Sequence, residues 1–211
     1  MAKMKNGILE GLSGAIGPVV AYQWKGRDCL RAREVARNDP RTPRQQACRR
    51  TFGVASQLAS AMLPAAALGF RLPAEEGKTT ERGCFMHVNS QCFSLVDGEV
   101  SIDYPAIKVA QGTLTGVRFA SPQTCEGGTV SVAFHSEEGG DASDYVLLFA
   151  YSPTARCGVL SLPAGRHQGV VTIDPPRFWT GHTLYLYGFA WDRRRLSASD
   201  SVFLGTVDLT S

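Results

Sequence analysis

The second half of the sequence constrains the fold most, because from residue 107 onward it consists of short β-type segments. These segments are separated by turn signals. Such a series is typical of an antiparallel β-sandwich. We expect an immunoglobulin-like sandwich over residues 107–211, with strands at 107–110, 116–120, 129–135, 145–151, 158–162, 169–173, 183–191 and 202–209.

Regularly spaced glycines and a hairpin pattern mark the N-terminus, residues 1–40. Glycine relaxes φ and lets another backbone approach closely. Residues 19–24 form a predicted strand, Lys25 and Gly26 a turn, and residues 27–35 a returning strand. We therefore predict a β arm whose assembly residues are Gly7, Gly11, Gly14, Gly17, Val19, Val20, Tyr22 and Trp24.

A short helical segment is expected between these parts, over residues 41–106. Thr42, Pro43 and Gln45 fit a helix start with a capping box. An apolar stripe at helical spacing then ends near Pro64, and residues 80–96 predict a second helix that Asp97 and Gly98 end. The stripe consists of Cys48, Phe52, Ala55, Ala59 and Met62 or Leu63.

Charge is distributed unevenly along the chain. Residues 1–50 hold 11 Lys and Arg against 4 Asp and Glu, a net +7, so the remainder carries −4 of the total +3. The stretch from Lys25 to Arg50 alone has nine basic and three acidic residues. Its arginines suit phosphates, or acidic groups on a neighbouring copy of the chain. The predicted basic contact face comprises Arg27, Arg31, Arg33, Arg44, Arg49 and Arg50.

No catalytic or nucleotide-binding motif stands in the sequence. The G-x-S-x-G elbow, the G-x-x-x-x-G-K-[ST] loop and a G-x-G-x-x-G after a strand are all missing. Cys84, His87 and Cys92 are metal-ligand types near one side of the second predicted helix, but their spacing is not that of a zinc site. We predict no catalytic, cofactor or metal residues. The six cysteines, without C-x-x-C pairs, are expected to be free and mostly buried thiols.

Several motifs mark a family resemblance. Residues 7–20 read G-I-L-E-G-L-S-G-A-I-G-P-V-V, W-K-G follows at 24–26, and residues 38–52 match N-P-R-T-x-x-Q-x-x-x-R-x-x-F with Asp39 inserted. Residues 199–205, S-D-S-V-F-L-G, continue the match. The chain thus resembles an uncharacterised family common in Bacteroidota, which implies no activity and no residue roles. Its N-P-x-T-x-x-Q helix is similar to segments of phage-associated proteins.

Together these features predict a non-catalytic, self-assembling structural protein, a component of a filament, surface layer or phage-like particle, joined through its N-terminal arm. The alternative is a nucleic-acid-binding protein that uses the basic stretch from Lys25 to Arg50. The expected partner is the chain itself, with nucleic acid or another acidic partner as the alternative. We expect cytoplasmic synthesis without a cleaved signal peptide, no membrane insertion, and a final place in a particle or extracellular filament.

Overall fold

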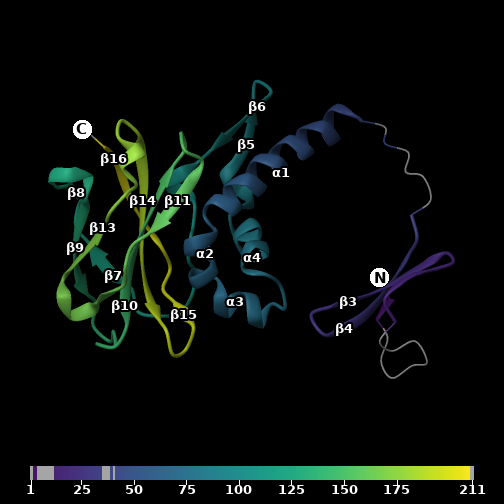
Figure 1. Cartoon of the computed structure of the whole chain (residues 1–211), viewed down its shortest axis with the longest axis horizontal. Coiled ribbons are helices and arrows are strands. Elements are labelled where there is room, and N and C mark those ends of the chain that lie inside the picture. Colours follow the sequence, from purple (N-terminus) through teal and green to yellow (C-terminus); the bar gives the residue numbers. More distant parts are fainter. Residues whose placement is uncertain (1, 4–11, 35–38, 40, 210–211) are drawn as a thin grey trace. The chain divides into compact units, whose positions relative to one another are not determined.

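The structure is a computed structural model that describes residues 2–3, 12–34, 39 and 41–209 (Figure 1). The chain divides into two compact units, Met1–Pro43 and Arg44–Ser211, which we call the arm and the body. Strand residues outnumber helical ones, and the helices follow the arm in sequence and precede the sandwich. The predicted fold class, mainly β with a helical middle, is confirmed.

The arm is a four-stranded antiparallel sheet. Its order is β1-β4-β3-β2. Strands β3 and β4 form the predicted hairpin, and φ is positive at both turn residues, 48° at Lys25 and 70° at Gly26, as a two-residue turn requires. The returning strand ends earlier than predicted, and Val35 lies outside the described residues. The strands are β1 (Ala2–Lys3), β2 (Gly14–Ile16), β3 (Val19–Trp24) and β4 (Arg27–Ala32).

The body begins with four described helices, so the prediction of two was wrong. Pro43 is the first residue of α1, as expected. The chain bends at Met62 and continues as α2, with Pro64 in the first turn, where its missing N–H needs no partner. The helices are α1 (Pro43–Ala61), α2 (Leu63–Gly69), α3 (Arg71–Glu76) and α4 (Glu81–Val88).

The predicted second helix was too long. Helix α4 ends at Val88, and a hairpin of β5 (Phe93–Val96) and β6 (Glu99–Ile102) follows a short 3-10 helix, Ser90–Cys92. Asp97 and Gly98, predicted to end a helix, have φ values of 50° and 83° and form the two-residue turn of this hairpin.

The apolar stripe of α1 was also wrong at its N-terminal end. Ala55, Leu58 and Ala59 are buried, but Phe52 is 67% exposed and Cys48 is exposed. Only the C-terminal half of α1 therefore belongs to the core of the body.

Two antiparallel sheets form the predicted sandwich. The larger has the order β11-β10-β14-β15, with β12 also beside β10 and β16 also beside β14; the smaller has the order β13-β9-β7, with β8 beside β9. Strands β7, β9 and β13 thus share the smaller sheet, and β10, β11, β14 and β16 share the larger one. Immunoglobulin-like domains divide their strands between two sheets in a similar way. The strands are β7 (Val117–Phe119), β8 (Gln123–Thr124), β9 (Val130–Ser136), β10 (Tyr145–Ser152), β11 (Cys157–Leu160), β12 (Ala164–Gly165), β13 (Val170–Ile173), β14 (Thr183–Asp192), β15 (Ser197–Ala198) and β16 (Val202–Asp208).

The larger sheet is buried on both faces, which gives the body three layers (Figure 1). Leu147 and Phe149 of β10 pack toward α1, α2 and α4. Val146 and Leu148, which alternate with them, pack against the smaller sheet. Strand β10 is therefore almost continuously hydrophobic, because neither of its faces meets water.

One predicted strand, 107–110, is a loop whose backbone is held by side chains. The amide of Lys108 donates to Asn89 Oδ1 at 2.7 Å, and Asn89 Nδ2 donates to the Lys108 carbonyl at 2.8 Å. Ser201 Oγ accepts from the amide of Val109 at 2.9 Å. These bonds satisfy backbone groups that a sheet ladder would otherwise pair.

Among the described residues, no single helix has the length and hydrophobicity to cross a membrane. Helices α1 and α2 have that length and hydrophobicity only when they are counted together, and the pair is bent by 78°.

Candidate functional site

The predicted assembly and basic residues of the arm meet on one face of its sheet. Register pairs Trp24 with Arg27, Tyr22 with Cys29 and Val20 with Arg31. Directly paired residues share a face, and residues two apart along a strand do too. We call the surface formed by Val20, Tyr22, Trp24, Arg27 and Arg31 the aromatic–basic face; Cys29 lies within it.

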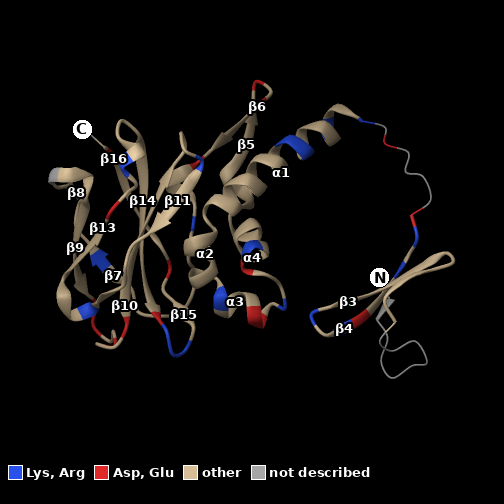
Figure 2. Cartoon of the chain, viewed as in Figure 1, with Lys and Arg blue, Asp and Glu red and all other residues tan. Residues whose placement is uncertain are grey.

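The hairpin tip adds a further positive charge beside this face. Lys25 Nζ lies 5.8 Å from the centre of the Trp24 ring, within the range of a cation–π contact. Trp24 is 46% exposed, and the ribbon in Figure 2 is coloured at the charged positions of β4 and of the hairpin tip. Arg33 follows β4, and its amide donates to the Pro18 carbonyl at 2.6 Å.

Two of the four glycines predicted to act in assembly are described, and both have a backbone conformation that favours glycine. Gly14 has a φ of 119° and Gly17 one of 56°, in the region that favours residues without a Cβ. Gly17 and Pro18 form the turn between β2 and β3, so Ile16 and Val19 are the first residues of the two strands to pair. Gly7 and Gly11 lie outside the described residues. Val19 faces away from the aromatic–basic face.

Among the described residues of the arm, the sheet edge at β2 is open. Within the described chain, β2 pairs only with β3. Ile16 and Val19 close a two-residue turn. The closing pair of such a turn exchanges both backbone hydrogen bonds, so the N–H and C=O of the next residue, Ala15, are expected to point away from β3. Ile16 is 54% exposed. This edge has the geometry that accepts another strand.

The arm has a very small core of its own. Of its described residues, only Ala21 and Cys29 are buried. A small sheet is stable by itself only when it has a hydrophobic face or packs against another element, and two buried residues make a very small hydrophobic face.

The helical arginines belong to the body, so the predicted basic contact face is divided between two units. Arg44, Arg49 and Arg50 lie in α1, and Arg50 Nη1 donates to the carbonyl of Gly98 at 3.3 Å (Figure 2). The arm holds 8 Lys and Arg against 4 Asp and Glu, a net +4, which leaves −1 for the body. The arm and the body still carry net charges of opposite sign, but the values are smaller than the +7 and −4 of residues 1–50 and 51–211.

The body contains no assembled metal site among its described residues. No group of three His, Cys, Asp or Glu side chains there is placed to hold an ion. Cys84 and His87 lie on α4, but Cys92 lies beyond its end.

All six thiols are free, and the expectation that most are buried was wrong: Cys29 is buried, whereas Cys48 and Cys125 are exposed.

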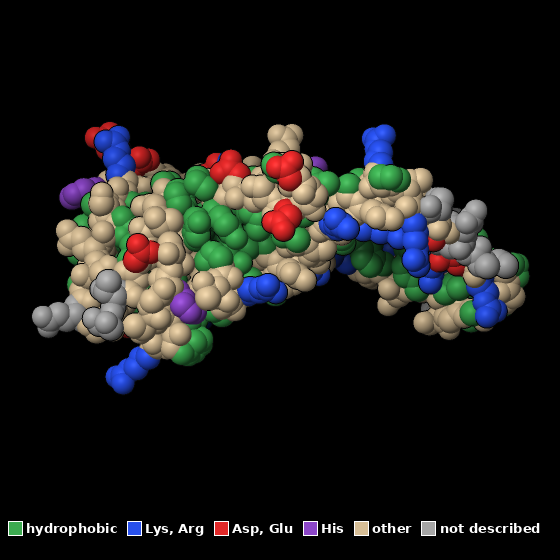
Figure 3. Space-filling view, turned by 90° about the horizontal axis from the view of Figure 1, so that it is seen from above, with side chains coloured by type: hydrophobic (Ala, Val, Ile, Leu, Met, Phe, Trp, Pro, Cys, Tyr) green, Lys and Arg blue, Asp and Glu red, His purple; other side chains and the backbone are tan. Residues whose placement is uncertain are grey.

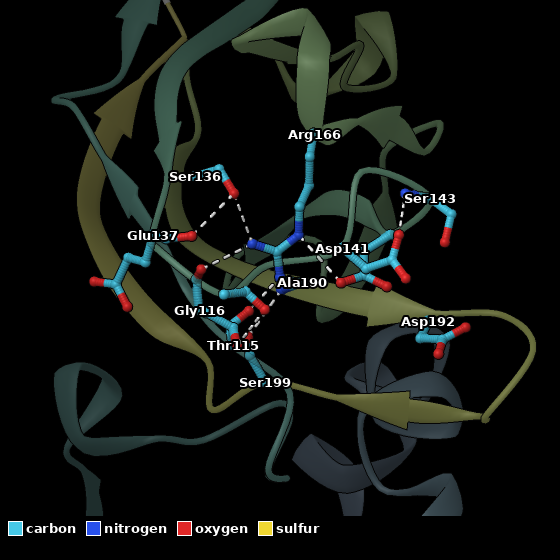
Figure 4. A network of polar contacts seen from close by, with 12 residues as sticks. Thr115, Gly116, Ser136, Glu137, Asp141, Ser143, Arg166, Ala190, Asp192 and Ser199 are labelled. Atoms are coloured by element: carbon cyan, nitrogen blue, oxygen red, sulfur yellow. Dashed lines mark hydrogen bonds and ion pairs between the residues drawn. The ribbon is translucent and has the colours of Figure 1, made fainter.

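A network of polar contacts in the body surrounds Arg166, in the short 3-10 helix Arg166–Gln168 (Figure 4). Its Nε lies 3.2 Å from Asp144 Oδ2, and both side chains are 2% exposed. Nη1 donates to the Gly116 carbonyl at 3.1 Å and to Ser136 Oγ at 3.0 Å, and Nη2 donates to the Thr115 carbonyl. Burial raises the pKa of Asp144, and the Arg166 guanidinium opposes that rise. Nε and Asp144 Oδ2 form an ion pair without hydrogen-bond geometry, whereas both terminal nitrogens of the guanidinium are hydrogen-bonded. These buried contacts, all within the body, indicate a structural role.

Alternation along residues 27–35 predicts that Arg27, Arg31 and Arg33 share one face with Cys29, but the pairing of Tyr22 and Trp24 with that face was missed. The signal was present, because a two-residue turn at Lys25 and Gly26 fixes every pair of the hairpin. It places Tyr22 and Trp24 beside the arginines.

Comparison with known proteins gives a family and no assigned activity. No curated protein matches the chain. A family model described as "Family of unknown function (DUF6266)" matches residues 11–205. This match spans the second half of the arm and almost all of the body, and on that basis the chain belongs to the DUF6266 family.

Proposed function

We propose that the protein is a non-catalytic structural component that assembles with copies of itself through the arm. The open β2 edge is the observation that carries the proposal. A strand from a neighbouring copy that pairs with it would gain main-chain hydrogen bonds. The resulting assembly is a filament, a surface layer or a phage-like particle, and a source among the Bacteroidota is part of the same proposal.

The composition of the arm supports this role. Residues 14–24 of β2 and β3 carry no charge that would oppose strand pairing, and natural edge strands usually carry such protection. The small core of the arm gives a second reason, because a further sheet or strand would cover apolar side chains such as Ile16.

The test is to block the edge without disturbing the hairpin. Ala15→Pro removes the outward N–H of β2 and leaves the hydrogen bonds between Ile16 and Val19 in place. Light scattering after size exclusion should show an oligomer for the unchanged chain of 22.8 kDa, and a dissociation constant raised about tenfold or more for the variant.

Ala15→Ser is the matched control and should assemble like the unchanged chain. Far-UV circular dichroism checks that both variants keep their strands. A full-length protein that remains monomeric at every concentration and salt level would refute the proposal.

The aromatic–basic face supports a second candidate function, binding of single-stranded nucleic acid. The guanidinium groups of Arg27 and Arg31 can contact phosphates. The rings of Trp24 and Tyr22 on the same face can stack on bases. Strand addition at the β2 edge does not explain why aromatic and basic residues share a face.

This alternative is tested by anisotropy with a labelled oligonucleotide at increasing salt. Binding should weaken steeply with salt, and Arg27→Gln with Arg31→Gln should reduce the salt slope by about two. Arg177→Gln, in the 3-10 helix Arg177–Trp179 of the body, is the control. No binding of any DNA or RNA at low salt would exclude this function.

A further inference from the structure

The body contains a groove that the assembly role does not use. It has a volume of about 640 Å³ and lies between α1 and the turn that joins β10 to β11. That volume is within the range of about 300–1,000 Å³ of small-molecule sites. Figure 3 looks onto the end of the body where this turn lies, and hydrophobic side chains gather there. The apolar and aromatic lining includes Val54, Leu58, Ala61, Ile102, Tyr104 and Tyr151.

Tyrosine rings that pack against one another at a tilt form one wall of the groove. The ring of Tyr104 lies 4.2 Å from that of Tyr185 and 5.8 Å from that of Tyr151, between ring centres. Tyr187 donates its hydroxyl to the carbonyl of Tyr104 at 2.8 Å, which fixes the backbone beneath the ring. Tyr104 is only half-buried, so its ring can take part in a further aromatic contact.

The wall carries no negative charge near neutral pH. Burial raises the pKa of Tyr104 and that of Tyr151 above the usual value for tyrosine. Both hydroxyls therefore stay protonated. The Tyr151 hydroxyl donates to that of Tyr104, so the Tyr104 hydroxyl is the one that can donate a hydrogen bond to a ligand.

Arg156 supplies the only charged side chain of the lining. It is exposed at the end of the turn and forms no ion pair with an acidic side chain of the described chain. Its φ of 52° is in the left-handed region, which costs a non-glycine residue about 1 kcal/mol. A guanidinium at the rim of an uncharged, aromatic groove is complementary to a carboxylate attached to an apolar ring.

We propose that this groove binds an aromatic carboxylate, with its ring against Tyr104 and the apolar side of α1 and its carboxylate on Arg156. Every lining residue belongs to the body, so the proposal is independent of the arm and of assembly.

Calorimetric titration of the full chain with three probes tests the proposal. 2-Naphthoate should bind. 2-Naphthalenemethanol has the same rings without the charge and should bind more weakly; octanoate has the charge without the rings and should also bind more weakly. No detectable 2-naphthoate binding, or equal binding of octanoate, would overturn the proposal.

Variants locate the site. Arg156→Gln should weaken 2-naphthoate binding about fivefold or more and leave 2-naphthalenemethanol unchanged. Arg177→Gln, which lies outside the groove, should change neither. Equal losses in the two variants would contradict the assignment.

A filling substitution provides a second readout. Val54→Trp places a large ring in the groove and should abolish binding of both naphthyl probes. Should this variant fail to fold, chemical-shift changes at the Tyr104 and Tyr151 rings of the unchanged chain decide the location: shifts there on adding 2-naphthoate support the site, and shifts confined to other residues refute it.

Discussion

Arg166 shows how one side chain can join segments that are distant in sequence. It contacts the chain just before β7, the end of β9 and Asp144 just before β10, and it is almost inaccessible to water (Figure 4). A buried charge is stable only when it is paired and hydrogen-bonded.

Arg166→Met should therefore lower the free energy of unfolding by about 3–5 kcal/mol, because it leaves the Asp144 carboxylate buried and unpaired. Urea denaturation measures the loss. Adding Asp144→Leu should recover part of it, since the unpaired charge is then gone. A loss below about 1 kcal/mol for the single variant would show that the pair is not needed.

A second residue-scale prediction concerns stability at high pH. Burial, together with neighbouring tyrosines, raises the pKa values of Tyr151 and Tyr187 above their usual value of 10.0. Above that pH the unfolded chain loses these protons while the folded chain keeps them. Stability should then fall with rising pH by about 1.4 kcal/mol per unit for each tyrosine.

Urea denaturation from about pH 9 upward tests this fall. Tyr151→Phe should remove one tyrosine's share of the slope. A slope that is unchanged in Tyr151→Phe would contradict the assignment.

At the scale of elements, the segment 107–110 is the most informative difference from expectation. Its residues have strand character, and Ile107, Val109 and Ala110 are buried. It pairs with the side chains of Asn89 and Ser201 instead of a strand. Asn89 is fully buried and also donates to the Phe85 carbonyl at 3.0 Å, so it links α4 to this segment.

Asn89→Ala should cost about 2–4 kcal/mol, because it leaves buried backbone groups of Lys108 without partners. Hydrogen exchange of the Lys108 amide should accelerate. The neighbouring Ser90→Ala is the control and should change neither quantity, because Ser90 is exposed. Unchanged protection of Lys108 in the Asn89 variant would refute this role.

At the scale of the whole molecule, the two cores of the body use no residue of the arm. They begin at Ala55 and combine the helices with both sheets. The body should therefore fold without the arm.

A chain lacking residues 1–43 should keep the melting temperature of the body within a few degrees, because it loses none of the two cores. It should also be monomeric if the arm mediates assembly. Calorimetry and light scattering measure the two properties separately. A large drop in melting temperature would show that the arm contributes to the stability of the body.

The sequence by itself determined the local features. Alternating hydrophobic residues located seven of the sandwich strands, Lys25 and Gly26 defined the turn of the arm hairpin, and Pro43 marked the start of α1. These features depend on neighbouring residues, whose conformational preferences can be read directly. The arm residues proposed for assembly were identified in the same way.

Only the tertiary structure decided which segments meet. It covered both faces of the larger sheet, left Phe52 outside the core and placed the helical arginines in the body instead of the arm. It also replaced an expected strand by bonds to Asn89 and formed the groove beside Arg156. The reason is physical: burial and pairing depend on residues distant in sequence, whose contacts no local pattern specifies.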